Sequence, residues 1–158
     1  MNTKLLLPHQ FKKTGWLLLI PSALFGMFIL IFDFEFSFLD AKAFTIYNHG
    51  FIDPPTIFWL INVNYTPTIS GFIFLVGAIL VAFSKEKHED EFIANIRLAS
   101  LVWATYVNYA ILAFCFLFFY NFQFGYVMLF NMFTILIFFI LRFYYSIYKT
   151  RKVLRHEE

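Results

Sequence analysis

The sequence has little that could cross-link or interrupt its chain. Among 158 residues it has a single cysteine, Cys115, with six glycines and five prolines. One cysteine cannot form an internal disulfide, and it excludes a membrane thiol oxidase, which needs paired cysteines. Charged residues make up only 14% of the chain, whereas 61% is hydrophobic. Because a soluble domain could not hide so much apolar surface, we predict an integral membrane protein.

Charged residues are absent from three long stretches, 14–32, 54–84 and 98–141. A helix needs about 20 apolar residues to cross a bilayer. The first two stretches each hold one such helix, and the third, 44 residues long, holds two around a turn. The sequence therefore predicts an all-α fold, an integral membrane four-helix bundle.

We expect one transmembrane domain, 1–158, with its spans at about 16–32, 67–83, 96–120 and 126–148. They are joined by an outer loop, 33–65, and a cytoplasmic loop, 84–95, and a cytoplasmic tail, 149–158, follows. Within the outer loop, Asp53 followed by Pro54 and Pro55 is typical of a helix start, with Asp as the cap and Pro at the first position. We therefore predict a short interfacial helix over about 55–62.

The basic residues are distributed very unevenly. Eleven of the twelve Lys and Arg residues fall on one side of these spans, and only Lys42 falls on the other. Basic residues concentrate on the cytoplasmic side of a membrane, so we expect both termini to be cytoplasmic. The basic residues lie at the ends of the spans and not in a continuous stripe, which argues against a nucleic-acid partner.

No Asp, Glu or His lies inside a predicted span. Ion-coupled transport usually needs an acid there, and a membrane bis-histidine haem needs facing histidines. We therefore expect no cofactor, no metal and no catalytic residue. Five residues of the outer loop could gather a divalent cation, although their spacing matches no metal motif: Asp33, Glu35, Asp40, His49 and Asp53.

Some polar residues do lie inside the last two spans. Four residues of the third share one helix face: Arg97, Ser100, Ala104 and Asn108. Four residues of the fourth span roughly do the same: Asn131, Thr134, Arg142 and Tyr145. Folding the two spans about their turn brings Asn108 within about a helical turn of Thr134. We interpret Ser100, Asn108, Asn131 and Thr134 as interior groups that form interhelical hydrogen bonds; the alternative is a polar ligand pocket.

The cytoplasmic ends of these two spans each carry an arginine, Arg97 and Arg142. One interpretation is that they anchor the helices in the headgroup region. The other is a latch in which Arg142 pairs with an acidic residue of the cytoplasmic loop or with a lipid phosphate. The acidic residues within reach are Glu86, Glu89, Asp90 and Glu91.

Several short segments resemble a known group of proteins. They are Leu7-Pro8-His9, Phe11-Lys12-Lys13, Gly15-Trp16, Ser84-Lys85-Glu86-Lys87, Glu89-Asp90-Glu91, Arg97-Leu98, Trp103-Ala104, Asn108-Tyr109 and Asn131-Met132-Phe133. In these segments the chain resembles an uncharacterised family of short four-helix inner-membrane proteins of Bacteroidota. The resemblance covers nearly the whole chain. It implies a multi-pass protein of the inner membrane and a shared fold, and it implies no activity.

These observations favour a small non-enzymatic membrane protein that acts through a membrane protein partner or as a homo-oligomer, for example as a sensory or regulatory accessory. One alternative is a transporter or channel subunit with a polar path past Asn108, Asn131 and Thr134. The other is an interfacial lipid-modifying enzyme, for which Asp33, Glu35 and His49 are the only support.

Overall fold

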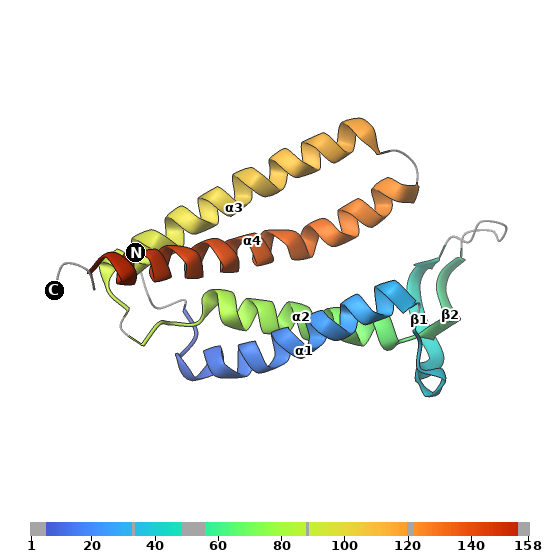
Figure 1. Ribbon diagram of the computed structural model, residues 1–158. Helices are drawn as coiled ribbons and strands as arrows, with labels where there is room; N and C mark the ends of the chain where they lie inside the picture. The colour runs from blue at the N-terminus through green and yellow to red at the C-terminus, as the bar shows by residue number, and fades with distance from the viewer. Residues whose placement is uncertain (1–5, 33, 49–55, 88, 120–121, 155–158) are drawn as a thin grey trace. The chain divides into compact units, whose positions relative to one another are not determined.

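The computed structural model describes residues 6–32, 34–48, 56–87, 89–119 and 122–154. In order, the elements are α1 (Gln10–Phe32), a short 3-10 turn η2 (Ser37–Leu39), β1 (Asp40–Asn48), β2 (Thr56–Asn64), α2 (Thr66–Phe83), α3 (Glu91–Phe118) and α4 (Phe122–Leu154). Figure 1 shows these elements along the chain. By the contacts between its residues, the chain divides into two compact units, Met1–Leu17 with Leu75–Glu158, and Leu18–Phe74.

Four helices within the described residues are long and apolar enough to cross a membrane. The shortest, α2, has 18 residues and the longest, α4, has 33. The expectation of four apolar helices is confirmed. Pro21 lies inside α1 without ending it.

The segment between α1 and α2 contains a β-hairpin, so the interfacial helix expected over about 55–62 is wrong. Strands β1 and β2 pair antiparallel, with Asp40 opposite Asn64 and Phe44 opposite Leu60. The sequence of β2, TIFWLINVN, is rich in β-branched and aromatic residues. These residues lose rotamer freedom in a helix and pack well on a pleated strand, which explains the outcome.

The base of the hairpin is tied to the start of α2 by side-chain hydrogen bonds. Asn64 Nδ2 donates to the Phe36 carbonyl at 2.9 Å and to Asp40 Oδ1 at 2.7 Å. Asn64 Oδ1 accepts from the backbone N–H of Thr66, which is one of the orphan donors at the start of α2. The Thr66 hydroxyl accepts from the Phe36 N–H at 3.0 Å. The side chain of Asn64 thus caps the start of α2.

In the other unit, α3 and α4 form an antiparallel hairpin (Figure 1). Helix α3 begins after Asp90, whose side chain caps it by accepting from the Ile93 N–H at 2.8 Å. Its buried residues are Ala94, Arg97, Ser100, Ala104 and Asn108, at helical spacing. The buried residues of α4 are Phe139, Ile140, Phe143 and Ile147. Of these, Phe143 lies against Arg97 of α3, and Phe139 stacks on Phe83 of α2.

Candidate functional site: an ion-paired loop between α2 and α3

The loop that joins α2 to α3, residues 84–90, carries two buried carboxylates. The Glu89 carboxylate accepts from Arg97 Nη2 at 3.0 and 3.2 Å, and Arg97 Nη1 donates to the Ala82 carbonyl at 2.9 Å. That carbonyl is one of the orphan acceptors at the end of α2, where a cation is favourable. Arg97 is only 3% exposed. A single guanidinium thus joins the end of α2, the loop and α3.

The second carboxylate ties the loop to the start of α1. Lys12 Nζ lies 2.6 Å from Glu86 Oε1, and the two side chains are 17% and 7% exposed. The backbone N–H of Glu86 donates to Glu89 Oε2 at 2.8 Å, so the two carboxylates belong to one network. Residues 84–87, 89 and 90 are not helical, and Glu89 binds Arg97 of α3.

The segment before α1 adds backbone contacts to the same loop. The Leu7 N–H donates to the Phe83 carbonyl at 3.0 Å, and the Lys85 N–H donates to the Leu7 carbonyl at 2.9 Å. His9 Nδ1 lies 2.9 Å from the Lys85 carbonyl. The carbonyls of Ala82, Phe83 and Lys85, which would otherwise need water, therefore have partners within the chain.

Aromatic rings cover the charged groups. The Arg97 guanidinium lies 4.6 Å from the centre of the Phe143 ring, and Lys12 Nζ lies 4.7 Å from that of Tyr144. Tyr144 also meets Trp16 edge to face, with ring centres 5.5 Å apart. Arg97 Nε and the Tyr144 hydroxyl are buried without a hydrogen-bond partner. The rings exclude water and so strengthen both ion pairs.

Beside this network, helix α1 comes very close to α2 at Gly15. A Cβ added to Gly15 would lie 2.9 Å from Leu80 Cβ and 2.9 Å from the backbone nitrogen of Val81. The backbones of α1 and α2 can therefore come together here only because residue 15 has no side chain. A contact with fixed backbone cannot be relieved by a rotamer change.

Arg97, rather than Arg142, forms the expected latch with the acidic loop. Of the expected carboxylates, Glu89 binds Arg97 and Glu86 binds Lys12. Asp90 caps α3, and Glu91 is exposed in its first turn. Arg142 is exposed, and its guanidinium lies 5.1 Å from the centre of the Trp103 ring. The reason is the position of Arg97 on the small-residue face of α3, whereas Arg142 lies on an outer face of α4.

Among the polar residues expected inside the helices, Asn108 of α3 and Asn131 of α4 form a hydrogen bond. Asn108 Nδ2 donates to Asn131 Oδ1 at 3.3 Å, while Asn108 Oδ1 is buried and unpaired. The partner is thus Asn131 and not Thr134, whose hydroxyl donates to the Phe130 carbonyl of its own helix at 2.8 Å. Ser100 is buried on the same face as Asn108.

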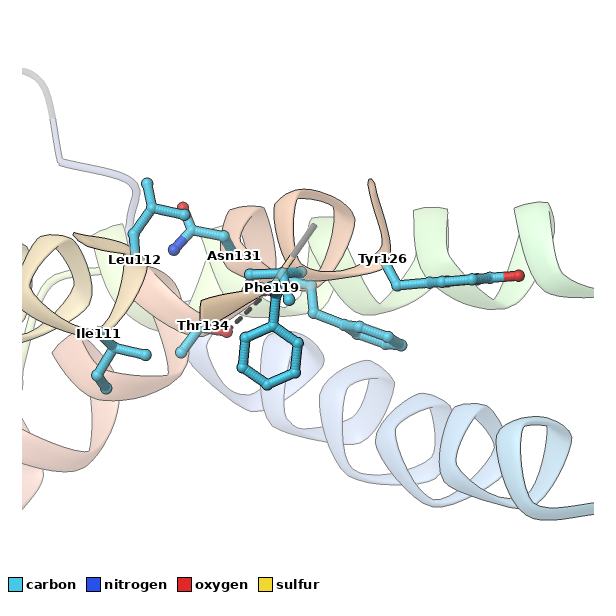
Figure 2. A pocket seen from close by; sticks show the side chains of 8 residues that line it. Ile111, Leu112, Phe119, Tyr126, Asn131 and Thr134 are labelled. Atoms are coloured by element: carbon cyan, nitrogen blue, oxygen red, sulfur yellow. Dashed lines mark hydrogen bonds between the residues drawn. The ribbon is translucent and has the colours of Figure 1, made fainter. Parts of the chain in front are cut away.

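Beyond this pair the hairpin opens into a cleft of about 470 Å³ between α3 and α4. Figure 2 shows its lining, with Ile111, Leu112 and Phe119 from the α3 side and Tyr126, Asn131 and Thr134 from α4. The dashed line marks the bond from Thr134 to the Phe130 carbonyl. That hydroxyl already has an acceptor, and the other polar side chains of the lining are those of Asn131 and Tyr126.

The five residues considered for a divalent cation are described only in part. Asp33, His49 and Asp53 fall outside the described residues. Glu35 and Asp40 are exposed, and Asp40 accepts from Asn64. The described residues contain no group of three or more His, Cys, Asp or Glu side chains placed to hold a metal ion.

Lys12, Trp16 and Tyr144 were not among the residues expected at a site, and Glu86 was expected as a partner of Arg142 and not of Lys12. One signal could have paired Lys12 with Glu86: antiparallel neighbours α1 and α2 put the start of one beside the end of the other, which brings Lys12 near Glu86. Nothing in the sequence shows that Tyr144 would face Trp16. Comparison with family models, curated proteins and solved structures finds no match to this chain.

Proposed function

We propose that this chain is a small, non-enzymatic inner-membrane protein that presents an ordered cytoplasmic loop to a protein partner, as a sensory or regulatory accessory. The observation that carries the proposal is the network of the loop, in which Glu86 and Glu89 are both bound by buried or partly buried cations. A loop held in this way has already lost its conformational entropy, so a partner does not have to order it on binding.

The same network supports binding over chemistry. Its charged groups are used in holding α1, α2 and α3 together, because each carboxylate has a cation at 2.6 to 3.0 Å. Around them Lys13, Lys87, Asp90 and Glu91 are exposed. Exposed charges of both signs on an ordered backbone suit the rim of a protein interface, where they select a partner by complementarity.

The orientation follows from the unequal distribution of Lys and Arg. In a Cys115→Ser background, Lys42→Cys and Lys87→Cys form a matched pair, because both lysines are exposed. With a membrane-impermeant maleimide on intact cells, Lys42→Cys should be labelled, and Lys87→Cys should be labelled only after permeabilisation. The opposite result would invert the topology.

A photo-crosslinking amino acid at Lys87 tests the partner. We expect a discrete adduct in native membranes that disappears when Glu89→Gln frees the loop. Glu91→Gln removes the same charge from an exposed side chain and should preserve the adduct. If Glu89→Gln leaves the adduct unchanged in a folded protein, the ordered loop is not what the partner recognises.

The second candidate function is a channel or transporter subunit, with the cleft between α3 and α4 as part of a path. Asn131 and Thr134 line this cleft, which favours the idea, but its other lining residues are mainly aliphatic and aromatic. A polar path would therefore need a second copy to complete it. Solute flux into proteoliposomes that Asn131→Leu abolishes would support this candidate over the first.

A further inference from the structure

The two arginines of the α3–α4 hairpin lie at the same level. Arg97 precedes Asn108 by eleven residues in α3, and Arg142 follows Asn131 by eleven residues in α4. Asn108 and Asn131 are joined by a hydrogen bond. Both arginines therefore lie about 16 Å from the amide pair. Since Arg97 binds Glu89 of the polar loop, this level is also where the apolar helices meet the charged end of the unit.

The surroundings of the two arginines differ. Arg97 is buried and has a carboxylate, whereas Arg142 is exposed and contacts the Trp103 ring. The ion pairs found in the described part of the chain do not include Arg142. A side chain on a helix points toward the helix N-terminus, so Arg142 of α4 and Trp103 of the antiparallel α3 lean toward each other. Trp103 thus covers one face of the guanidinium and leaves its N–H groups available.

Other exposed groups of α4 continue this surface. Tyr145 is 58% exposed, and Lys149 is exposed as well. Positions 142, 145 and 149 share one face of the helix. The result is a strip with two cations and a phenol, at the level where tryptophan and tyrosine favour the membrane interface. A guanidinium matches the oxygens of a phosphate in a bidentate geometry, and an ammonium adds a point charge.

We propose that Arg142, Lys149 and Trp103 form a binding site for the phosphate of an anionic phospholipid in the adjacent leaflet. Arg142 binds the phosphate oxygens, Trp103 holds the guanidinium in place, and Lys149 supplies the second positive charge. Clusters of basic residues at the cytoplasmic ends of membrane helices recognise anionic headgroups in this way. The inference goes beyond partner binding and rests only on insertion of the helices into a bilayer.

The test is native mass spectrometry of the purified protein, titrated with phosphatidylglycerol and with phosphatidylcholine of the same acyl chains. We expect a preference for phosphatidylglycerol that Arg142→Gln lowers at least threefold and Lys149→Gln lowers less. Arg142→Lys should keep part of it. Lys87→Gln, which removes an exposed charge from the loop between α2 and α3, is the matched control and should keep it all.

Three results would overturn the proposal. The first is an unchanged preference in Arg142→Gln. The second is a change from dimer to monomer in that variant with the lipid preference kept, which would mean that a carboxylate of a second copy pairs with Arg142. The third is displacement of the lipid by millimolar inorganic phosphate, which would indicate a site for a free anion. Should Arg142→Gln fail to fold, Lys149→Gln carries the same comparison. No partner protein is present, so failure here is separate from failure of loop binding.

Discussion

The two halves of the α3–α4 hairpin differ in how closely the helices pack. In the half next to the ion-paired loop, Ala104 is 0% exposed and Phe139 and Phe143 are each 1% exposed. In the half next to the turn, Phe114 is 57% exposed and Met128 is 59% exposed, and the cleft opens between the helices. The helices in Figure 1 move apart toward this turn.

The residues of α3 explain the difference. In the closely packed half α3 buries Ala94, Ser100 and Ala104, and in the open half its Ile111 and Leu112 line the cleft. In lipid the surrounding tails are as apolar as the side chains, so close van der Waals contact decides where helices meet. Small residues allow that contact, and branched ones hold the backbones apart. The open half is therefore available for lipid, for a second copy or for a partner helix.

The largest loss of stability should come from breaking the ion pair in the closely packed half. Arg97→Gln leaves the Glu89 carboxylate buried without a cation, which costs about 3 kcal/mol. The measurement is the free energy of unfolding in mixed detergent micelles. Arg142→Gln, which removes an exposed arginine at the same level, is the control and should cost at most about 1 kcal/mol.

A double variant sharpens this result. Arg97→Met with Glu89→Leu removes both charges and should recover most of the lost free energy, because replacing a whole buried pair with apolar groups is often neutral. If the double variant is as unstable as Arg97→Gln, the loss comes from packing against Phe143 or from the hydrogen bond to Ala82 and not from the unpaired carboxylate.

A smaller loss should follow from enlarging a small residue in the same half. Ala104→Leu places a branched side chain where none fits, at a cost of about 2 kcal/mol. Ala113→Leu makes the same change at an exposed position of α3 and should be nearly neutral. Thermal unfolding of both variants in detergent measures the difference. Equal losses would mean that close approach of α3 and α4 does not depend on small residues.

The sequence predicts the four helices well because each is marked by a long stretch of uncharged residues. Uncharged stretches of helix-spanning length identify α1, α2, α3 and α4, and the spacing of Arg97, Ser100, Ala104 and Asn108 indicates one face of α3. That face is the one the structure buries. What the sequence does not show is the rotation of α4 against it, and this rotation places Asn131 rather than Thr134 beside Asn108 and leaves Arg142 outside.

The β-hairpin of β1 and β2 shows a second limit of prediction from the sequence. Two prolines after Asp53 are a local signal for a helix start, but the strand preference of β2 and its pairing with β1 outweigh that signal. A cap signal marks only where a helix could begin, whereas the pairing of two nine-residue strands satisfies a row of backbone groups. The Lys12–Glu86 pair was missed for a related reason, because its residues are 74 positions apart.

The smallest effect should come from the Asn108–Asn131 bond at the boundary between the two halves. At 3.3 Å this bond is long, and Asn108 Oδ1 stays unpaired, so Asn108→Leu should cost only about 0.6 kcal/mol. Asn131→Leu and the double variant complete a cycle, and we expect a coupling free energy of similar size from unfolding in mixed micelles. Thr134→Val is the control, because the Thr134 hydroxyl bonds within its own helix, and it should be nearly neutral. A cycle with no coupling would mean that the amides do not hold the helices together, and that the packed half ends at Ala104. A larger cost for Thr134→Val than for Asn108→Leu would instead make Thr134 the polar contact between α3 and α4.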